Sequence, residues 1–235
     1  MSEYERPYKY GATAKQSLTV NGRPRAVAFQ NPGGIAGVWA EENTRDAIFD
    51  ALKRRETFAT SGPRITPRFF AGWEIPESLC RSEQLAQDAY ALGVPMGGVL
   101  PQRTTNQQSP RFLVAAHADP GTADAPGHPL QRLQIIKGWV GQDGQFHQQV
   151  IDIAGNADNG ASVDPMSCET TGTGFASLCG VWTDPSFDAS QDAVYYARAV
   201  ENPSCRWSTR QCLLLPENER PDGCSNPRIP RTIQE

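Results

Sequence analysis

The side chains best placed for chemistry are two glutamates that follow a short apolar run near the start of the chain. Glu41 and Glu42 follow residues 35–39, IAGVW, after a single alanine, and Asn43 comes next. In a βα barrel the loop at the C-terminal end of a strand faces the active site. Either glutamate could therefore hydrogen-bond to a metal ligand without binding the metal itself. The alternative is that Asn43 caps a helix whose positive end favours the two carboxylates, and this structural role is the more common one.

The histidines form no recognisable metal site. His117 and Asp119 would project to the same side at the end of a strand, but two ligands without a third are incomplete, and the Pro-Gly pair that follows favours a turn role for Asp119. His128 lies in a loop rich in Pro and Gly, and His147 lies on the polar face of a predicted hairpin strand. We therefore predict no catalytic residue, no cofactor-binding residue and no metal ligand in this chain.

Other sequence features with chemical potential have simpler structural interpretations. The run TTGTG at 170–174 lacks the Lys-Ser/Thr step and the following helix of a phosphate loop, so we interpret it as a turn. No Gly-x-Ser-x-Gly motif marks a nucleophilic serine. Aromatic residues on the predicted strands could form a platform for glycans, although such residues more often pack in a core. These residues are Trp139, Trp182, Trp207, Tyr195 and Tyr196.

The cysteines indicate the compartment. The chain has six of them: Cys80, Cys168, Cys179, Cys205, Cys212 and Cys224. An even number in turn-rich segments favours disulfides and an oxidising compartment over buried free thiols. The spacings match no CxxC zinc pair, which makes a metal site the least favoured of the three alternatives. We expect an exported protein, in the periplasm or a similar compartment.

The sequence of residues 31–65 predicts one strand followed by one helix. The Gly62-Pro63 step then ends this unit before the next strand. The apolar run 35–39 suits a buried strand of a parallel sheet. Asn43 and Asp46 have capping-box spacing, so the helix should run from about 44 to 55 and cover a core with its apolar face. Such a unit cannot bury a core alone, and only about thirty residues precede it. We therefore expect the remaining strands to lie in a segment missing from the N-terminus.

Three segments carry a resemblance to a known family: GVWAEENTRDAIFDALKRRETFATSGPRI, LQRLQIIKGWVGQDGQFHQQVIDIAG, and ARAVENPSCRWST with the terminal TIQE. They resemble the C-terminal third of domain-of-unknown-function family 3604 (DUF3604), which is similar to the polymerase-and-histidinol-phosphatase (PHP) metallohydrolases. The resemblance implies the last βα unit of a PHP-like barrel, followed by a β-rich tail. It also implies that the His-x-His pair and the divalent metal of such enzymes, zinc, manganese or similar, belong to the missing N-terminal barrel portion of the same protein.

The rest of the chain predicts an antiparallel, immunoglobulin-like β-sandwich, so the fold class is mixed α/β and β. Predicted strands lie at 64–73, 111–117, 130–140, 145–153, 177–182 and 193–200, and residues 82–92 suit one or two helical turns or an irregular loop. The Asp143-Gly144 step favours a tight hairpin. We predict three segments: a barrel remnant at 1–63, the sandwich at 64–201, and an irregular tail rich in Cys and Pro at 202–235.

Composition excludes two classes of partner. A formal net charge of −4 and a pI near 5.5 provide no basic surface for nucleic acid. No apolar run is long enough to span a bilayer. The sequence thus predicts the non-catalytic C-terminal portion of an exported metal-dependent hydrolase of phosphoester, ester or amide bonds. The alternative is a β-sandwich module that binds a glycan or a protein at the cell surface.

Overall fold

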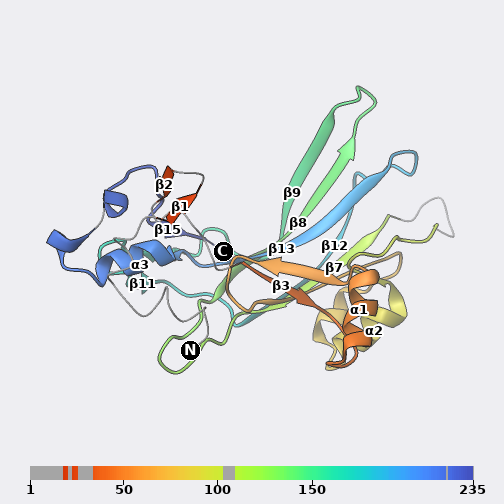
Figure 1. Ribbon diagram of the computed structural model, residues 1–235. Helices are drawn as coiled ribbons and strands as arrows, with labels where there is room; N and C mark the ends of the chain where they lie inside the picture. The colour runs from red at the N-terminus through yellow and green to blue at the C-terminus, as the bar shows by residue number, and fades with distance from the viewer. Residues whose placement is uncertain (1–17, 21–22, 26–33, 103–108, 221, 235) are drawn as a thin grey trace. The chain divides into compact units, whose positions relative to one another are not determined.

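The computed structural model describes residues 18–20, 23–25, 34–102, 109–220 and 222–234 (Figure 1). The chain forms two compact units. The larger unit comprises Ile35–Asn159 and Thr173–Asn202, and the smaller unit comprises the described parts of Met1–Gly34, Gly160–Gly172 and Pro203–Gln234. Each unit is therefore made of segments that alternate along the sequence. The predicted boundaries at 63 and 201 instead divide the chain into consecutive segments, and they stay a prediction.

The first sheet of the larger unit has four antiparallel strands. Their order is β12 (Ser177–Thr183), β7 (Arg111–His117), β5 (Thr66–Gly72) and β6 (Val94–Pro95). Because side chains alternate along a strand, the register that pairs Phe69 with Val114 puts both on one face and leaves Phe70 and Leu113 on the other. Both faces carry buried apolar residues, so this sheet is the central layer of the unit.

The second sheet has three antiparallel strands, with β8 (Leu130–Val140) between β13 (Ala193–Glu201) and β9 (Phe146–Gly155). The hairpin between β8 and β9 turns at Gly144, whose φ of 72° is natural only for glycine. This confirms the hairpin predicted from the Asp-Gly step. In Figure 1 these three strands run together and diverge from the first sheet toward the hairpin tips.

The main core lies between the two sheets. Leu133 and Ile135 of β8 pack with Phe69, Phe112 and Val114 of the first sheet, and all five are at least 92% buried. A second core lies on the opposite face of the first sheet, under the 3-10 helix η4 (Glu77–Arg81) and helix α2 (Leu85–Leu92). The disulfide between Cys80 and Cys179 joins η4 to β12 across this second core.

A third part of the larger unit is the β3–α1–β4 module, made of β3 (Ile35–Val38), α1 (Arg45–Lys53) and β4 (Thr57–Thr60). Strands β3 and β4 pair antiparallel with each other as a separate two-stranded sheet. The half of β3 that begins at Ile35 is exposed. The strand at 35–38 is therefore not the buried parallel strand that the sequence predicts, because its described partner is the antiparallel β4.

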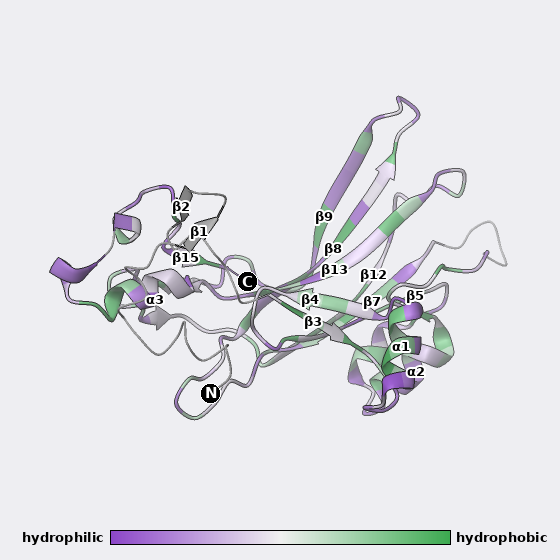
Figure 2. Cartoon of the chain, in the orientation of Figure 1, coloured by the Kyte–Doolittle hydropathy of each residue, from purple (hydrophilic) through white to green (hydrophobic). Residues whose placement is uncertain are grey.

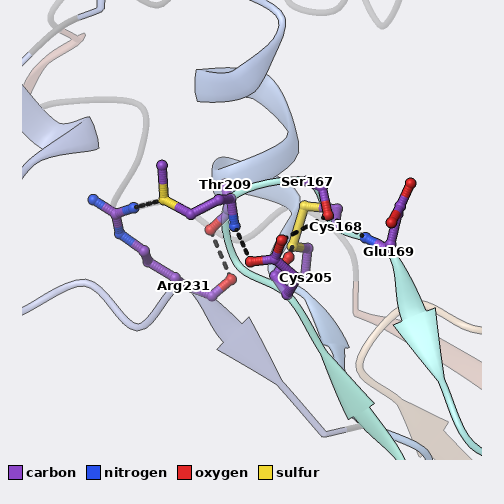
Figure 3. The surroundings of a disulfide bond; sticks show 8 residues. Ser167, Cys168, Glu169, Cys205, Thr209 and Arg231 are labelled. Carbon is purple, nitrogen blue, oxygen red and sulfur yellow. Dashed lines mark hydrogen bonds between the residues drawn. A yellow bond between two sulfur atoms is a disulfide. The ribbon is translucent and has the colours of Figure 1, made fainter.

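The smaller unit consists of short elements and two disulfides. Its strands are β1 (Leu18–Val20), β2 (Arg23–Arg25), β10 (Ser162–Val163), β11 (Thr170–Thr171), β14 (Ser204–Cys205) and β15 (Thr232–Ile233). Its helices are α3 (Trp207–Leu213), η5 (Glu217–Glu219) and η6 (Asp222–Cys224). Figure 3 shows the Cys168–Cys205 disulfide beside Thr209, whose hydroxyl donates a hydrogen bond of 2.7 Å to the backbone oxygen of Arg231. Cys212 and Cys224 form the other disulfide, between α3 and η6.

The architecture is mixed α/β, with mostly antiparallel sheets and three α-helices in the described residues. The predicted strands 111–117 and 130–140 match β7 and β8 residue for residue. Of the alternatives predicted for 82–92, the helical one is found, as α2 at Leu85–Leu92. The tail, expected to be irregular, contains α3 at Trp207–Leu213. Figure 2 shows that α1 and α2 carry both hydrophobic and hydrophilic residues, and no described helix has the length and apolar character to cross a membrane.

Candidate functional site

The most unusual surface of the larger unit is an apolar face on the β3–α1–β4 module. We call Phe49 and Leu52 the α1 face; their side chains are 63% and 53% exposed. Phe49 and Leu52 are three residues apart, so they are neighbours on the helix surface. Only the other side of the apolar stripe is covered, where Ala51 is fully buried. Helix α1 thus has a wider apolar face than the described residues bury.

The start of α1 is fixed by Thr44, and not by Asn43 as predicted. The Thr44 hydroxyl accepts a hydrogen bond from the backbone N–H of Ala47 at 3.3 Å and donates one to Oε1 of Glu42 at 3.0 Å. Glu41 is exposed beside it. The two predicted candidate glutamates therefore lie at the N-terminal end of α1, where carboxylates are ordinarily stabilised.

A buried carboxylate anchors this module to the first sheet. Glu56 is 3% exposed, and its side chain lies 3.9 Å from the Arg68 guanidinium on β5 and accepts a hydrogen bond from the Tyr90 hydroxyl on α2. Burial and the hydrogen bond to Glu56 raise the pKa of Tyr90. Arg68 in turn stacks 3.4 Å above the ring of Trp39, whose indole N–H donates to the backbone oxygen of Pro67.

The turn that ends α1 holds an arginine in a conformation that favours glycine. The N–H of Arg55 donates to the oxygen of Leu52 and that of Glu56 to the oxygen of Ala51, which is the Schellman arrangement. Arg55 has a φ of 62°, and its Nε donates to the backbone oxygen of Gly97 at 3.2 Å. A Cβ on Gly97 would lie 2.3 Å from the Arg55 oxygen, so only glycine permits this approach.

Arg55 lies on the border of a groove of about 880 Å³ in the larger unit. The groove continues the inter-sheet core: Phe69 and Phe112 line it from the first sheet, and Ala193 and Tyr195 from the second. The segment 94–102 and the residues Trp73 and Phe187 complete the wall. The Trp73 and Phe187 rings meet edge to face at 5.8 Å.

Behind Tyr195 lies a buried ion pair, between Lys137 and Asp184. The Lys137 ammonium is 2.6 Å from Oδ2 of Asp184, and the two side chains are 4% and 0% exposed. The Tyr195 hydroxyl donates to the same oxygen at 2.7 Å, and Ser186 donates to the other from its backbone and its hydroxyl. Burial opposes ionisation of Asp184, but these hydrogen bonds outweigh it and lower its pKa. Burial and the bond to Asp184 raise the pKa of Tyr195.

The other residues considered from the sequence do not come together. Asp119 accepts hydrogen bonds from the backbone N–H groups of Arg64 and Gly121, which confirms its turn role, and the Arg64 bond is the main reason that its pKa is lowered. Trp182 and Tyr195 pack on Phe112 in the core, whereas Tyr196 is 54% exposed. In the described part of the chain no three His, Cys, Asp or Glu side chains gather as metal ligands.

The sequence did not predict the groove, the Glu56–Arg68 contact or the Lys137–Asp184 ion pair. One partial signal was present for Lys137: on a strand it shares a face with Leu133 and Ile135, which are buried in the main core. No comparable signal existed for the contact of Arg55 with Gly97, because the two residues are 42 positions apart in the sequence. The disulfide prediction is confirmed, since all six cysteines are paired.

Comparison with known proteins identifies a family. No curated protein matches the chain, and no solved structure matches it. The family described as "Protein of unknown function (DUF3604)" matches residues 5–235, which is nearly the whole sequence. The chain with the interleaved units, the exposed α1 face and the inter-sheet groove therefore belongs to the DUF3604 family.

Proposed function

We propose that this chain is the non-catalytic, β-rich portion of an exported metal-dependent hydrolase, and that its β3–α1–β4 module covers a PHP-like barrel. The observation that carries the proposal is the exposed α1 face of Phe49 and Leu52. A helix in water places such residues against a core, so the face requires a partner. The resemblance of this segment to the last βα unit of a PHP-like barrel makes the barrel the expected partner.

The barrel portion and this chain would have different roles. The barrel portion would hold zinc, manganese or a similar divalent ion, which lowers the pKa of a bound water and polarises a phosphoester, ester or amide. Residues of this chain would position the module: Glu56, Arg68 and Trp39 fix it on the first sheet. Export is supported by three disulfides, which persist in oxidising compartments.

The test compares this chain with the full product of its gene. Metal content is measured by mass spectrometry, and hydrolysis is measured on nitrophenyl phosphates, esters and anilides. We expect metal and activity in the full product and neither in the 235-residue chain. Stoichiometric metal and hydrolysis in the 235-residue chain alone would overturn the proposal, as would glycan or protein binding by a full product that has no hydrolytic activity.

The docking role is tested by a charge on the α1 face. We expect Phe49→Asp with Leu52→Asp to lower metal retention and thermal stability of the full product, because two buried carboxylates would face an apolar partner. The matched control is Phe146→Asp with Val194→Asp on the second sheet, since these side chains are 67% and 65% exposed. Equal effects of the two pairs would remove the support for docking through α1.

A further inference from the structure

We propose that the groove between the two sheets of the larger unit binds a small organic anion with an apolar body, whose charged head meets Arg55. The volume of about 880 Å³ falls within the range of ligand sites. The site lies inside one compact unit, so its shape depends on that unit alone. It requires neither the barrel nor the metal of the proposed hydrolase.

The apolar body is inferred from the wall. Most lining residues are aromatic or aliphatic, and the principal ones are Phe69, Trp73, Met96, Val99, Phe187 and Tyr195. Their polar atoms are already used: the Trp73 N–H donates to the oxygen of Pro101 and the Tyr195 hydroxyl donates to Asp184. An aromatic or aliphatic body would lose water together with these apolar side chains, and the described wall also carries the polar side chains of Gln102, Gln191 and Asp192.

The charged head is inferred from Arg55. Among the described residues of the groove wall its side chain is the one cation, and its Nε–H bond to Gly97 uses one of five guanidinium donors. Carboxylate, sulfonate and phosphate oxygens suit the remaining donors. Asp192 is the one carboxylate among the described wall residues, on the side of the second sheet, and it disfavours a second negative charge on the ligand.

The backbone of Arg55 is a second and independent observation. Glycine is the usual residue at this position of a Schellman turn, because a side chain at a φ of 62° is strained. Turn formation alone would therefore favour glycine. Arginine nevertheless occupies this strained position, and Gly97 permits the close approach because it lacks a Cβ. A ligand-binding role for the arginine side chain explains why it is there.

The experiment compares two dyes of the same shape. Anilinonaphthalene sulfonate carries a negative head, and N-phenyl-1-naphthylamine is its neutral relative; both are titrated by fluorescence and calorimetry. We expect one saturable site for the sulfonate. Arg55→Gln should weaken sulfonate binding about tenfold, the size of one charge-assisted hydrogen bond, and leave the neutral dye within about twofold. Arg45→Gln, an exposed arginine at the start of α1, should change neither.

Further variants separate binding from folding. Arg55→Gly should raise the melting temperature or leave it unchanged while weakening the sulfonate as Arg55→Gln does. Val99 is 81% exposed, so Val99→Asp should keep the fold and weaken both dyes. The proposal is overturned if the sulfonate binds without saturation, or if Arg55→Gln leaves it unchanged or weakens both dyes equally. None of these variants alters the α1 face, so this result is separate from the docking test.

Discussion

At the scale of single residues, the Lys137–Asp184 pair shows how a charge can be stable in a β core. The ammonium has Asp184, the Ser186 backbone oxygen and the Ser186 hydroxyl as acceptors, so its three donors all have partners. The Asp184 carboxylate accepts from Lys137, Tyr195 and Ser186. Because every partner is satisfied, the cluster fixes the Tyr195 ring that forms part of the groove wall.

The first prediction concerns Lys137→Met. This substitution leaves the Asp184 carboxylate buried without its cation, so we expect a loss of about 3–5 kcal/mol in the free energy of unfolding. Lys137→Met with Asp184→Leu should recover part of that loss, because no uncompensated charge remains. Urea unfolding measures both variants, with Lys53→Met on the exposed end of α1 as the control.

A double variant less stable than Lys137→Met would contradict this explanation. Burial of an unpaired Asp184 charge would then not be the cause of the lower stability of Lys137→Met. A loss of less than about 1 kcal/mol in the single variant would place the ammonium at the surface in solution.

Residue-scale features divide into those that the sequence predicts and those that depend on the fold. The turn role of Asp119 was predictable, because its partner Gly121 is two residues away. The groove was not, because it joins Arg55 and Trp73 to Phe187 and Tyr195 across more than a hundred positions of chain. The cap of α1 was misassigned by one residue, since Asn43 and Thr44 both have acceptor side chains and only geometry distinguishes them.

At the scale of elements, the long strands of the larger unit and the β8–β9 hairpin were predicted well, but the short strands and the direction of the β3 pairing were not. Residues 130–140 alternate only in part, yet β-branched and aromatic residues bounded by turn signals gave the correct limits of β8. The strand at 35–38 was also placed correctly, but a parallel partner was expected and β4 is antiparallel. A short apolar strand is compatible with either direction, so pairing is determined by residues distant in sequence.

The second prediction is at this scale and concerns the close approach of two turns. Gly97→Ala introduces a Cβ 2.3 Å from the Arg55 oxygen at a φ of 82°, so both backbone strain and a clash oppose it. We expect a loss of about 2–4 kcal/mol in the free energy of unfolding, together with weaker binding of the sulfonate dye in the groove.

The matched control is Gly144→Ala in the β8–β9 hairpin. Gly144 has a similar φ of 72° and nothing within 4 Å of a new Cβ, so only the strain of about 1–2 kcal/mol should appear. The difference between the two variants isolates the contact of Gly97 with Arg55. Equal losses would show that this contact relaxes at no cost.

At the scale of the whole molecule, the two units are stabilised by different means. The larger unit has two apolar cores on the faces of its first sheet. In the smaller unit the described strands have two or three residues each, and two disulfides join its segments. Because short strands bury little apolar surface, the smaller unit should depend on its covalent links far more than the larger one does.

The third prediction follows from that difference. Cys80–Cys179 closes a separation of 99 residues and Cys212–Cys224 one of 12, and loop entropy alone would make them worth about 4.7 and about 3 kcal/mol. Replacing Cys80 and Cys179 with alanine should nevertheless leave the larger unit folded, with a lower melting temperature, because its two cores remain. Replacing Cys212 and Cys224 should unfold the smaller unit near room temperature, because little apolar burial is left to oppose chain entropy. Hydrogen exchange resolved by peptide reports the units separately, and protected amides in α3 without Cys212–Cys224 would show that the smaller unit has a sufficient core of its own.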